Sequence, residues 1–226
     1  MDYHVISSIA LWAPRIVIPA LLVFTTLVFL RNKEGREGVL RRRLWILSFL
    51  TIVFMIGYSL LLTFGQHAVW QNGTELTKFL VTAPVSTAVP FPSAIEFTRP
   101  FFNHSGGYFM FYVLGRFWLR VGILLLVSFA FYAFLRLLRN YRGHFFAEGE
   151  MELGLLCALL SGWPGVLVFI PGALFYTVIM SMYRLKVLKE SRTTLGISFL
   201  LSVMTIFVLS IFGDPTAFFH ISALKV

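Results

Sequence analysis

The fold of this chain is decided by one long apolar run, residues 151–183, with the sequence MELGLLCALLSGWPGVLVFIPGALFYTVIMSMY. A transmembrane helix needs about 20 apolar residues, so this run is unusually long for one span. Gly162-Trp163-Pro164-Gly165 interrupts it with the Gly and Pro residues that are typical of turns. The turn separates a first piece of about twelve residues, whose helical length of about 18 Å cannot cross a bilayer core of roughly 30 Å. We therefore expect a short re-entrant or hairpin helix followed by a longer helix.

The composition of the whole chain is that of an integral membrane protein. Of its 226 residues, 58% are hydrophobic and 13% are charged. Soluble domains are roughly 45–50% apolar and about 25% charged. These values exclude an ordinary cytosolic domain and a disordered chain, and the single cysteine, Cys157, excludes an internal disulfide.

Four further apolar runs predict membrane-spanning helices, and we expect an all-α polytopic protein with about five full spans in a single transmembrane domain, 1–226. The mixed stretch 65–107 holds four of the nine prolines. We expect it to form an extracytoplasmic or interfacial loop that packs on the membrane face or partly re-enters. The four runs are Ile16–Leu30, Leu44–Phe64, a third that begins near Tyr108 and is continuous from Val121 to Leu138, and Leu195–Phe212.

The net charge of +9 is explained by loops that Lys and Arg keep in the cytoplasm. Loop 31–43 holds six basic residues, segment 136–142 holds three and segment 184–192 holds four. All three lie on one side of the membrane only if the run 151–183 turns back, which supports the hairpin. No basic run is interleaved with polar or stacking residues, so we expect no nucleic-acid partner.

The carboxylates are few enough to weigh one by one, and the acidic patch around Glu150 is the first candidate for chemistry. Glu148, Glu150 and Glu152 alternate at the start of the short helix. Acids at this position stabilise a helix N-terminus, which is the structural alternative. Because Glu150 and Glu152 are about 200° apart around a helix, at most one of them faces a given site.

Glu96 is the other candidate acid, and Arg116 and Arg120 are the candidate basic residues. Arg99, three residues after Glu96, is its obvious partner. Arg116 and Arg120 are one helical turn apart at the start of the third apolar run. We expect them to lie in the membrane interface and to bind lipid phosphate or a partner, and a buried role, including a pair with Glu96, is the alternative.

The sequence predicts no metal site and no cofactor. The five histidines are scattered without a ligand motif, and His144 near the acidic patch has no specific spacing. No phosphate-binding loop, serine-hydrolase motif or dinucleotide fingerprint occurs.

The segment 143–165, GHFFAEGEMELGLLCALLSGWPG, resembles the second catalytic motif of the type IV prepilin peptidases, which are GxGD-type membrane aspartic proteases. Gly149-Glu150 stands in place of the family's Gly-Asp, and Gly162-Trp163 falls at the matching distance. The family's first glycine and its lysine are replaced by Ala147 and Glu152. The similarity covers roughly residues 121–214, the C-terminal half, and includes Gly213-Asp214 at the end of the last apolar run.

The resemblance implies a bacterial inner-membrane protein that cleaves leader segments of membrane-inserted, prepilin-like single-span proteins at the cytoplasmic face. Glu150 would then be one catalytic acid, and Glu96 the second, because two carboxylates must share the acid and base roles. The alternative is a non-catalytic membrane subunit or scaffold that binds a membrane partner or lipid. Both readings stay open at the level of sequence.

Overall fold

The computed structural model describes residues 3–31, 37–85, 93–141, 147, 149–188 and 195–212. Every element within these ranges is helical, which confirms the expected all-α fold. The 3₁₀ helix is η1, and η2 and η4 are π-helical turns. The elements are α1 (Tyr3–Leu30), α2 (Glu37–Gln71), α3 (Glu75–Thr82), η1 (Ser93–Phe102), α4 (Gly107–Val113), η2 (Leu114–Trp118), α5 (Leu119–Tyr141), α6 (Glu150–Ser161), α7 (Val166–Tyr183), η4 (Arg184–Leu188) and α8 (Leu195–Phe212).

Four helices of the described part are long and apolar enough to cross a membrane, which confirms a polytopic membrane protein. The expected fifth span corresponds to α8, whose apolar stretch Leu195–Ser210 is shorter than the other four. The four long stretches are Trp12–Leu30, Gly38–Gln71, Gly107–Tyr141 and Val166–Lys186.

The described chain forms two compact units. Unit 1 contains residues within 1–14 and 56–121, and unit 2 contains residues within 15–55 and 122–225. The acidic patch belongs to unit 2, whereas Glu96, Arg116 and Arg120 belong to unit 1.

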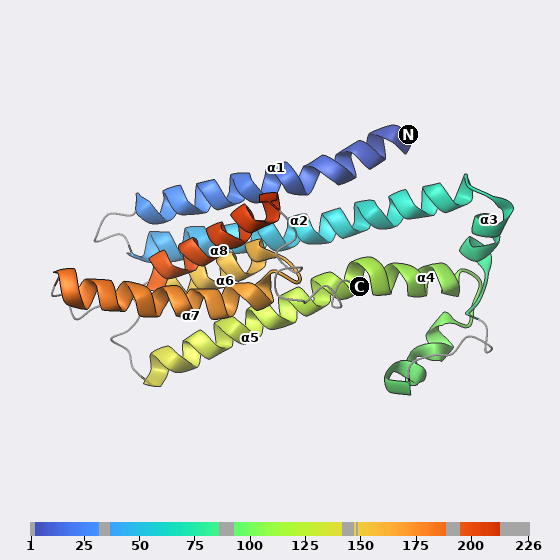
Figure 1. Ribbon diagram of the computed structural model, residues 1–226. Helices are drawn as coiled ribbons and strands as arrows, with labels where there is room; N and C mark the ends of the chain where they lie inside the picture. Colours follow the sequence, from blue (N-terminus) through green and yellow to red (C-terminus); the bar gives the residue numbers. More distant parts are fainter. Residues whose placement is uncertain are drawn as a thin grey trace. The chain divides into compact units, whose positions relative to one another are not determined.

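The short helix α6 forms the centre of unit 2. Every residue from Glu150 to Leu160 is buried, because apolar side chains cover all faces of this helix and neighbouring helices surround it. It packs against α7 and α8, as Figure 1 shows. Rings from three helices meet in this core, where Phe131, Phe169 and Phe199 have centroids 5.8 to 6.2 Å apart.

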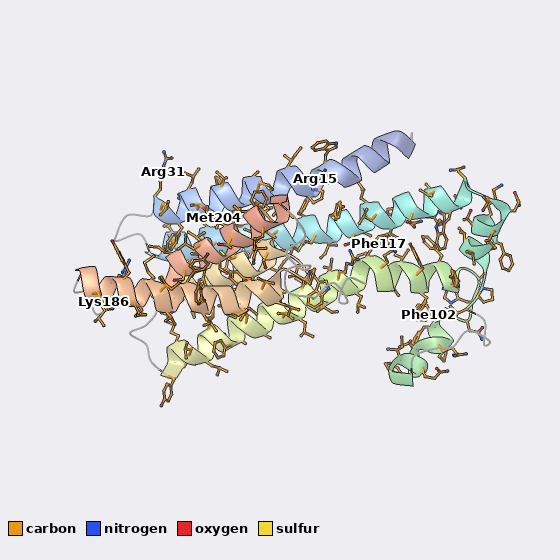
Figure 2. The ribbon with its side chains drawn as sticks, viewed as in Figure 1. Arg15, Arg31, Phe102, Phe117, Lys186 and Met204 are labelled. Carbon is orange, nitrogen blue, oxygen red and sulfur yellow. The ribbon has the colours of Figure 1, made fainter. Side chains whose placement is uncertain are left out.

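The long apolar run turns back on itself, as the hairpin hypothesis predicts. The run is divided at Gly162–Gly165 into α6 and α7. Glu150, at the start of α6, accepts a hydrogen bond from the amide of Gly196 at the start of α8, and it is also stabilised by the charge of Arg184 at the end of α7. Both ends of the run 150–184 therefore lie at the same end of unit 2. Figure 2 shows Arg31 and Lys186 at one end of this unit as well.

Unit 1 gives structure to much of the stretch 65–107. The helix α2 does not end near Phe64 but continues to Gln71, and α3 and η1 follow within the described residues. Backbone hydrogen bonds join these segments to the start of α4: Tyr108 donates to Ala83, and Val85 donates to Phe102. The stretch is therefore folded against α4 rather than extended.

Candidate functional site

The candidate site is the start of α6, where Gly149 sets the backbone that the acidic residues follow. Gly149 has φ 84°, a left-handed conformation that glycine adopts without strain. A Cβ at this position would lie 3.0 Å from Cδ2 of Leu40, so α2 packs directly on the glycine. Local backbone geometry and the contact with α2 thus both require glycine immediately before Glu150.

Glu150 is held on both of its oxygens by backbone amides. The amide of Gly196 donates to Oε1 at 2.9 Å, and the amide of Ala147 donates to Oε2 at 3.0 Å. The residue is only 1% exposed. Its carboxyl group therefore links the start of α6 to the start of α8 and to the segment that precedes α6.

The environment of Glu150 acts on its pKa in two opposite directions. Burial raises the pKa of the Glu150 carboxyl above its usual value, because desolvation penalises the charged form. The amides of Gly196, Ala147 and Leu195 and the positive charge of Arg184 oppose this effect. Burial is the larger influence, so the protonated form is favoured relative to an exposed glutamate.

Glu152 faces a different neighbour, as the 200° separation predicts. Its Oε1 lies 2.9 Å from Nε of Arg41 on α2, and its side chain is 1% exposed while that of Arg41 is 57% exposed. Neither oxygen of Glu152 accepts a hydrogen bond from a described residue. The two acids thus face two different helices, with Glu150 bonded towards α8 and Glu152 paired with α2.

Glu96 lies in unit 1, on η1, and the expected pairing with Arg99 is present. Nε of Arg99 lies 2.8 Å from Oε1 of Glu96. The side chain of Glu96 is 52% exposed, so water reaches this carboxylate. The described partner of Glu96 is thus a cation three residues away on the same helix, and the described partners of Glu150 are backbone amides of unit 2.

Arg116 and Arg120 are both exposed, and they lie within the continuous helical stretch that begins at Gly107, next to the expected beginning near Tyr108. The stretch Gly107–Tyr141 is helical throughout, and Arg116 falls in its π-helical turn η2. The guanidinium carbon of Arg116 lies 5.7 Å from the ring centre of Tyr112, within the range of a cation–π contact.

Sequence reasoning did not identify three partners of the acidic patch: Arg41, Arg184 and Gly196. Arg41 and Arg184 were used only as members of the basic segments that indicate the cytoplasmic side of the membrane. A buried carboxylate requires a compensating charge or hydrogen bonds, so a basic partner from the same side could have been predicted, but not which one. The amide of Gly196 carries no signal in the sequence.

The described residues contain no cluster of metal-ligating side chains. Among those residues, no group of three or more His, Cys, Asp or Glu side chains could hold a metal ion. Glu148, His144 and Asp214 lie outside the described residues.

No protein-family model, curated protein or solved structure gives a significant match to this chain. The resemblance to the prepilin peptidases therefore rests on the motif residues around Gly149-Glu150 and Gly162-Trp163 alone.

Proposed function

We propose that this protein is a non-catalytic membrane subunit that holds a membrane-inserted partner, and that its acidic hairpin is structural. The observation that carries the proposal is the bonding of Glu150. A carboxylate that activates water needs a free oxygen and access for that water. Both oxygens of Glu150 accept backbone hydrogen bonds, and the residue is 1% exposed.

The contacts of the two buried acids give the hairpin its structural role. Glu150 joins α6 to α8, and Glu152 joins α6 to α2 through Arg41. The position that resembles a catalytic aspartate is thus used to close a helical bundle. We infer that replacing the family's Asp by Glu lengthens the side chain enough to reach the amide of Gly196.

The partner that best suits such a subunit is a single-span, prepilin-like protein in a bacterial inner membrane. Because α6 is enclosed by its neighbours, the apolar surface of unit 2 is supplied by the long helices. Leu126 and Leu137 on α5 and Phe175 on α7 are strongly exposed. Such faces suit either acyl chains or a transmembrane helix that packs by van der Waals contact.

A peptidase remains the second candidate, and one observation favours it. Burial raises the pKa of Glu150, which is the direction that suits a general acid. In that interpretation Glu150 is the acid, and Glu96, the second acid that the resemblance implies, belongs to the other unit.

Co-expression with a prepilin-like single-span protein separates the two candidates. We expect the wild-type chain to leave the leader segment uncleaved, as measured by the mass of the substrate, and to co-purify with it. The variants Glu150→Gln and Glu96→Gln should leave the substrate mass unchanged. The variant Glu75→Gln is the matched control, because it also removes one exposed, ion-paired carboxylate from unit 1.

Cleavage by the wild-type chain that is lost in both Glu150→Gln and Glu96→Gln, but kept in Glu75→Gln, would overturn the proposal in favour of the peptidase. Absence of both cleavage and co-purification would exclude prepilin-like proteins as the partner class. Cleavage by the wild-type chain would by itself overturn the non-catalytic proposal, so a folding defect in the Glu150 variant affects only the assignment of the catalytic acids.

A further inference from the structure

We propose that Arg116 and Arg120 bind the phosphate of an anionic phospholipid, with Tyr112 and Trp70 as the aromatic wall of the site. The site lies in unit 1 and involves none of the residues of the acidic hairpin.

Arg116 and Arg120 lie at the edge of the charge-free part of their helix. Both precede Val121–Leu135, whose 15 residues extend about 22 Å as a helix before Arg136 ends the stretch. The long side chains of the arginines on either side account for the rest of a bilayer core of roughly 30 Å. Their guanidinium groups therefore fall where hydrocarbon gives way to headgroups. Arginine at this depth lowers its energy by pairing with an anion, and the phosphodiester is the anion present there.

The positive charges of Arg116 and Arg120 are not neutralised by carboxylates within the described ranges. No described carboxylate forms an ion pair with Arg116 or Arg120. The described carboxylates of unit 1, Glu75 and Glu96, pair with Lys78 and Arg99. Two adjacent exposed cations thus remain available for an external anion.

Aromatic contacts hold the guanidinium group of Arg116 in a defined position. Its guanidinium carbon lies 5.7 Å from the ring centre of Tyr112, which in turn lies 4.9 Å from the ring of Trp70 on α2. Nε1 of Trp118 donates to Oγ1 of Thr63 on α2 at 3.3 Å, which ties η2 to α2. Phe117, labelled in Figure 2, marks this turn.

The π-helical turn contributes to the same arrangement. η2 spans Leu114–Trp118 and includes Arg116. Such turns are often found at functional sites in helices. A cation–π contact leaves the N–H groups at the edge of the guanidinium free to donate to phosphate oxygens.

A lipid fits this site better than an acidic protein segment because the surroundings of the arginines are apolar. Leu114, which begins the turn, and Leu119, which follows it, are both exposed large apolar side chains. A ligand with a phosphate above and acyl chains below matches both the charge and the apolar surface. Trp and Tyr rings are enriched at this level of membranes, as Trp70 and Tyr112 are here.

The test is native mass spectrometry of the full chain in detergent, titrated with short-chain phosphatidylglycerol. We expect the double variant Arg116→Gln/Arg120→Gln to bind at least about tenfold more weakly than wild type, because it loses the charge-assisted hydrogen bonds. The variant Tyr112→Leu should bind a few-fold more weakly, since it removes the ring beneath Arg116. The matched control is Lys78→Gln/Arg99→Gln, which removes two positive charges from the same unit that are already ion-paired.

Two further ligands distinguish the source of the phosphate. We expect short-chain phosphatidylcholine to bind more weakly than phosphatidylglycerol, and inorganic phosphate to compete poorly. Equal losses in the Arg116/Arg120 and Lys78/Arg99 variants would overturn the site in favour of general charge attraction. Full competition by inorganic phosphate would overturn the lipid assignment. The co-expression experiment measures cleavage and co-purification of a prepilin-like protein and uses variants at other residues. The lipid site and the proposed function can therefore fail independently of each other.

Discussion

Two acid–arginine pairs of nearly equal length lie in very different surroundings. Arg99 and Glu96 on η1 of unit 1 are 2.8 Å apart, and Arg41 and Glu152 of unit 2 are 2.9 Å apart. The first pair is formed within one turn of helix by a half-exposed acid, whereas the second joins two helices and contains an acid that is 1% exposed. Exposed pairs contribute about 0–1 kcal/mol, while breaking a buried pair costs about 3–5 kcal/mol. Burial, rather than the distance between the charges, sets the energetic difference between these pairs.

The largest effect should come from removing the arginine of the buried pair. We expect Arg41→Ala to lower the free energy of unfolding by about 3 kcal/mol, the lower end for a broken buried pair, because Arg41 itself is half in solvent. Chemical unfolding in detergent measures this. The control Arg42→Ala removes an exposed neighbouring charge and should change stability by less than about 0.5 kcal/mol.

Equal effects of Arg41→Ala and Arg42→Ala would contradict the pairing. Adding Glu152→Leu to Arg41→Ala should recover most of the loss, since it removes the buried carboxylate left without its partner.

The next largest effect is expected at glycines with a left-handed backbone. Two of them, one in each unit, have the same conformation and can be compared. Gly149 has φ 84° and Gly106 has φ 83°. A Cβ on Gly149 would lie 3.0 Å from Leu40, whereas on Gly106 the nearest atom would be the carbonyl oxygen of Val81 at 3.4 Å. We expect Gly106→Ala to cost about 1 kcal/mol from backbone strain alone, and Gly149→Ala about 2 kcal/mol from strain and crowding together. Thermal unfolding of both variants checks this order, and the reverse order would show that α2 yields easily.

A smaller effect should depend on pH through Glu150. Its folded-state pKa is raised, so its contribution to stability is fully present below the pKa of the unfolded chain and is lost as pH rises through the folded pKa. We expect the unfolding midpoint of wild type to fall relative to that of Glu150→Gln as pH increases from about 4.5 towards neutrality. Comparing the two proteins at each pH cancels effects common to both. A difference that stays constant with pH would show that burial does not govern this carboxyl.

The smallest effect is expected at the Glu96–Arg99 pair, whose acid is 52% exposed and whose arginine is 20% exposed. Glu96→Gln should change the free energy of unfolding by less than about 1 kcal/mol, because water already screens the charge on this half-exposed side chain. A loss as large as that of Arg41→Ala would contradict the half-exposed position of Glu96 on η1.

Local spacing was sufficient to predict much of what is seen. The Gly and Pro residues at 162–165 predicted the break between α6 and α7, and the i, i+3 spacing predicted the Glu96–Arg99 pair. The helical angle between Glu150 and Glu152 predicted that they face different neighbours. Each of these depends on residues within one or two helical turns, where periodicity determines geometry.

Contacts between distant segments could not be predicted in the same way. The partner of Glu152 is 111 positions away, on α2, and several arginines of the basic loop were equivalent candidates. The extension of α2 to Gln71 was missed because apolar content marks the membrane portion of a helix and not its end. Packing between helices decides which arginine pairs with Glu152. The helix α2 continues past Phe64 because Gly65 alone does not end it, and the first turn-forming pair after Phe64 is Asn72-Gly73.

The burial of Cys157 has a practical consequence for mapping this protein. It is the only cysteine in the sequence, and its side chain is inaccessible to solvent in the core of unit 2. Thiol reagents should therefore not label the folded native chain, so the wild-type protein is the unlabelled control. Cysteines introduced singly into segments 31–43, 184–192 or 65–107 can then be probed from either side of the membrane without first altering α6.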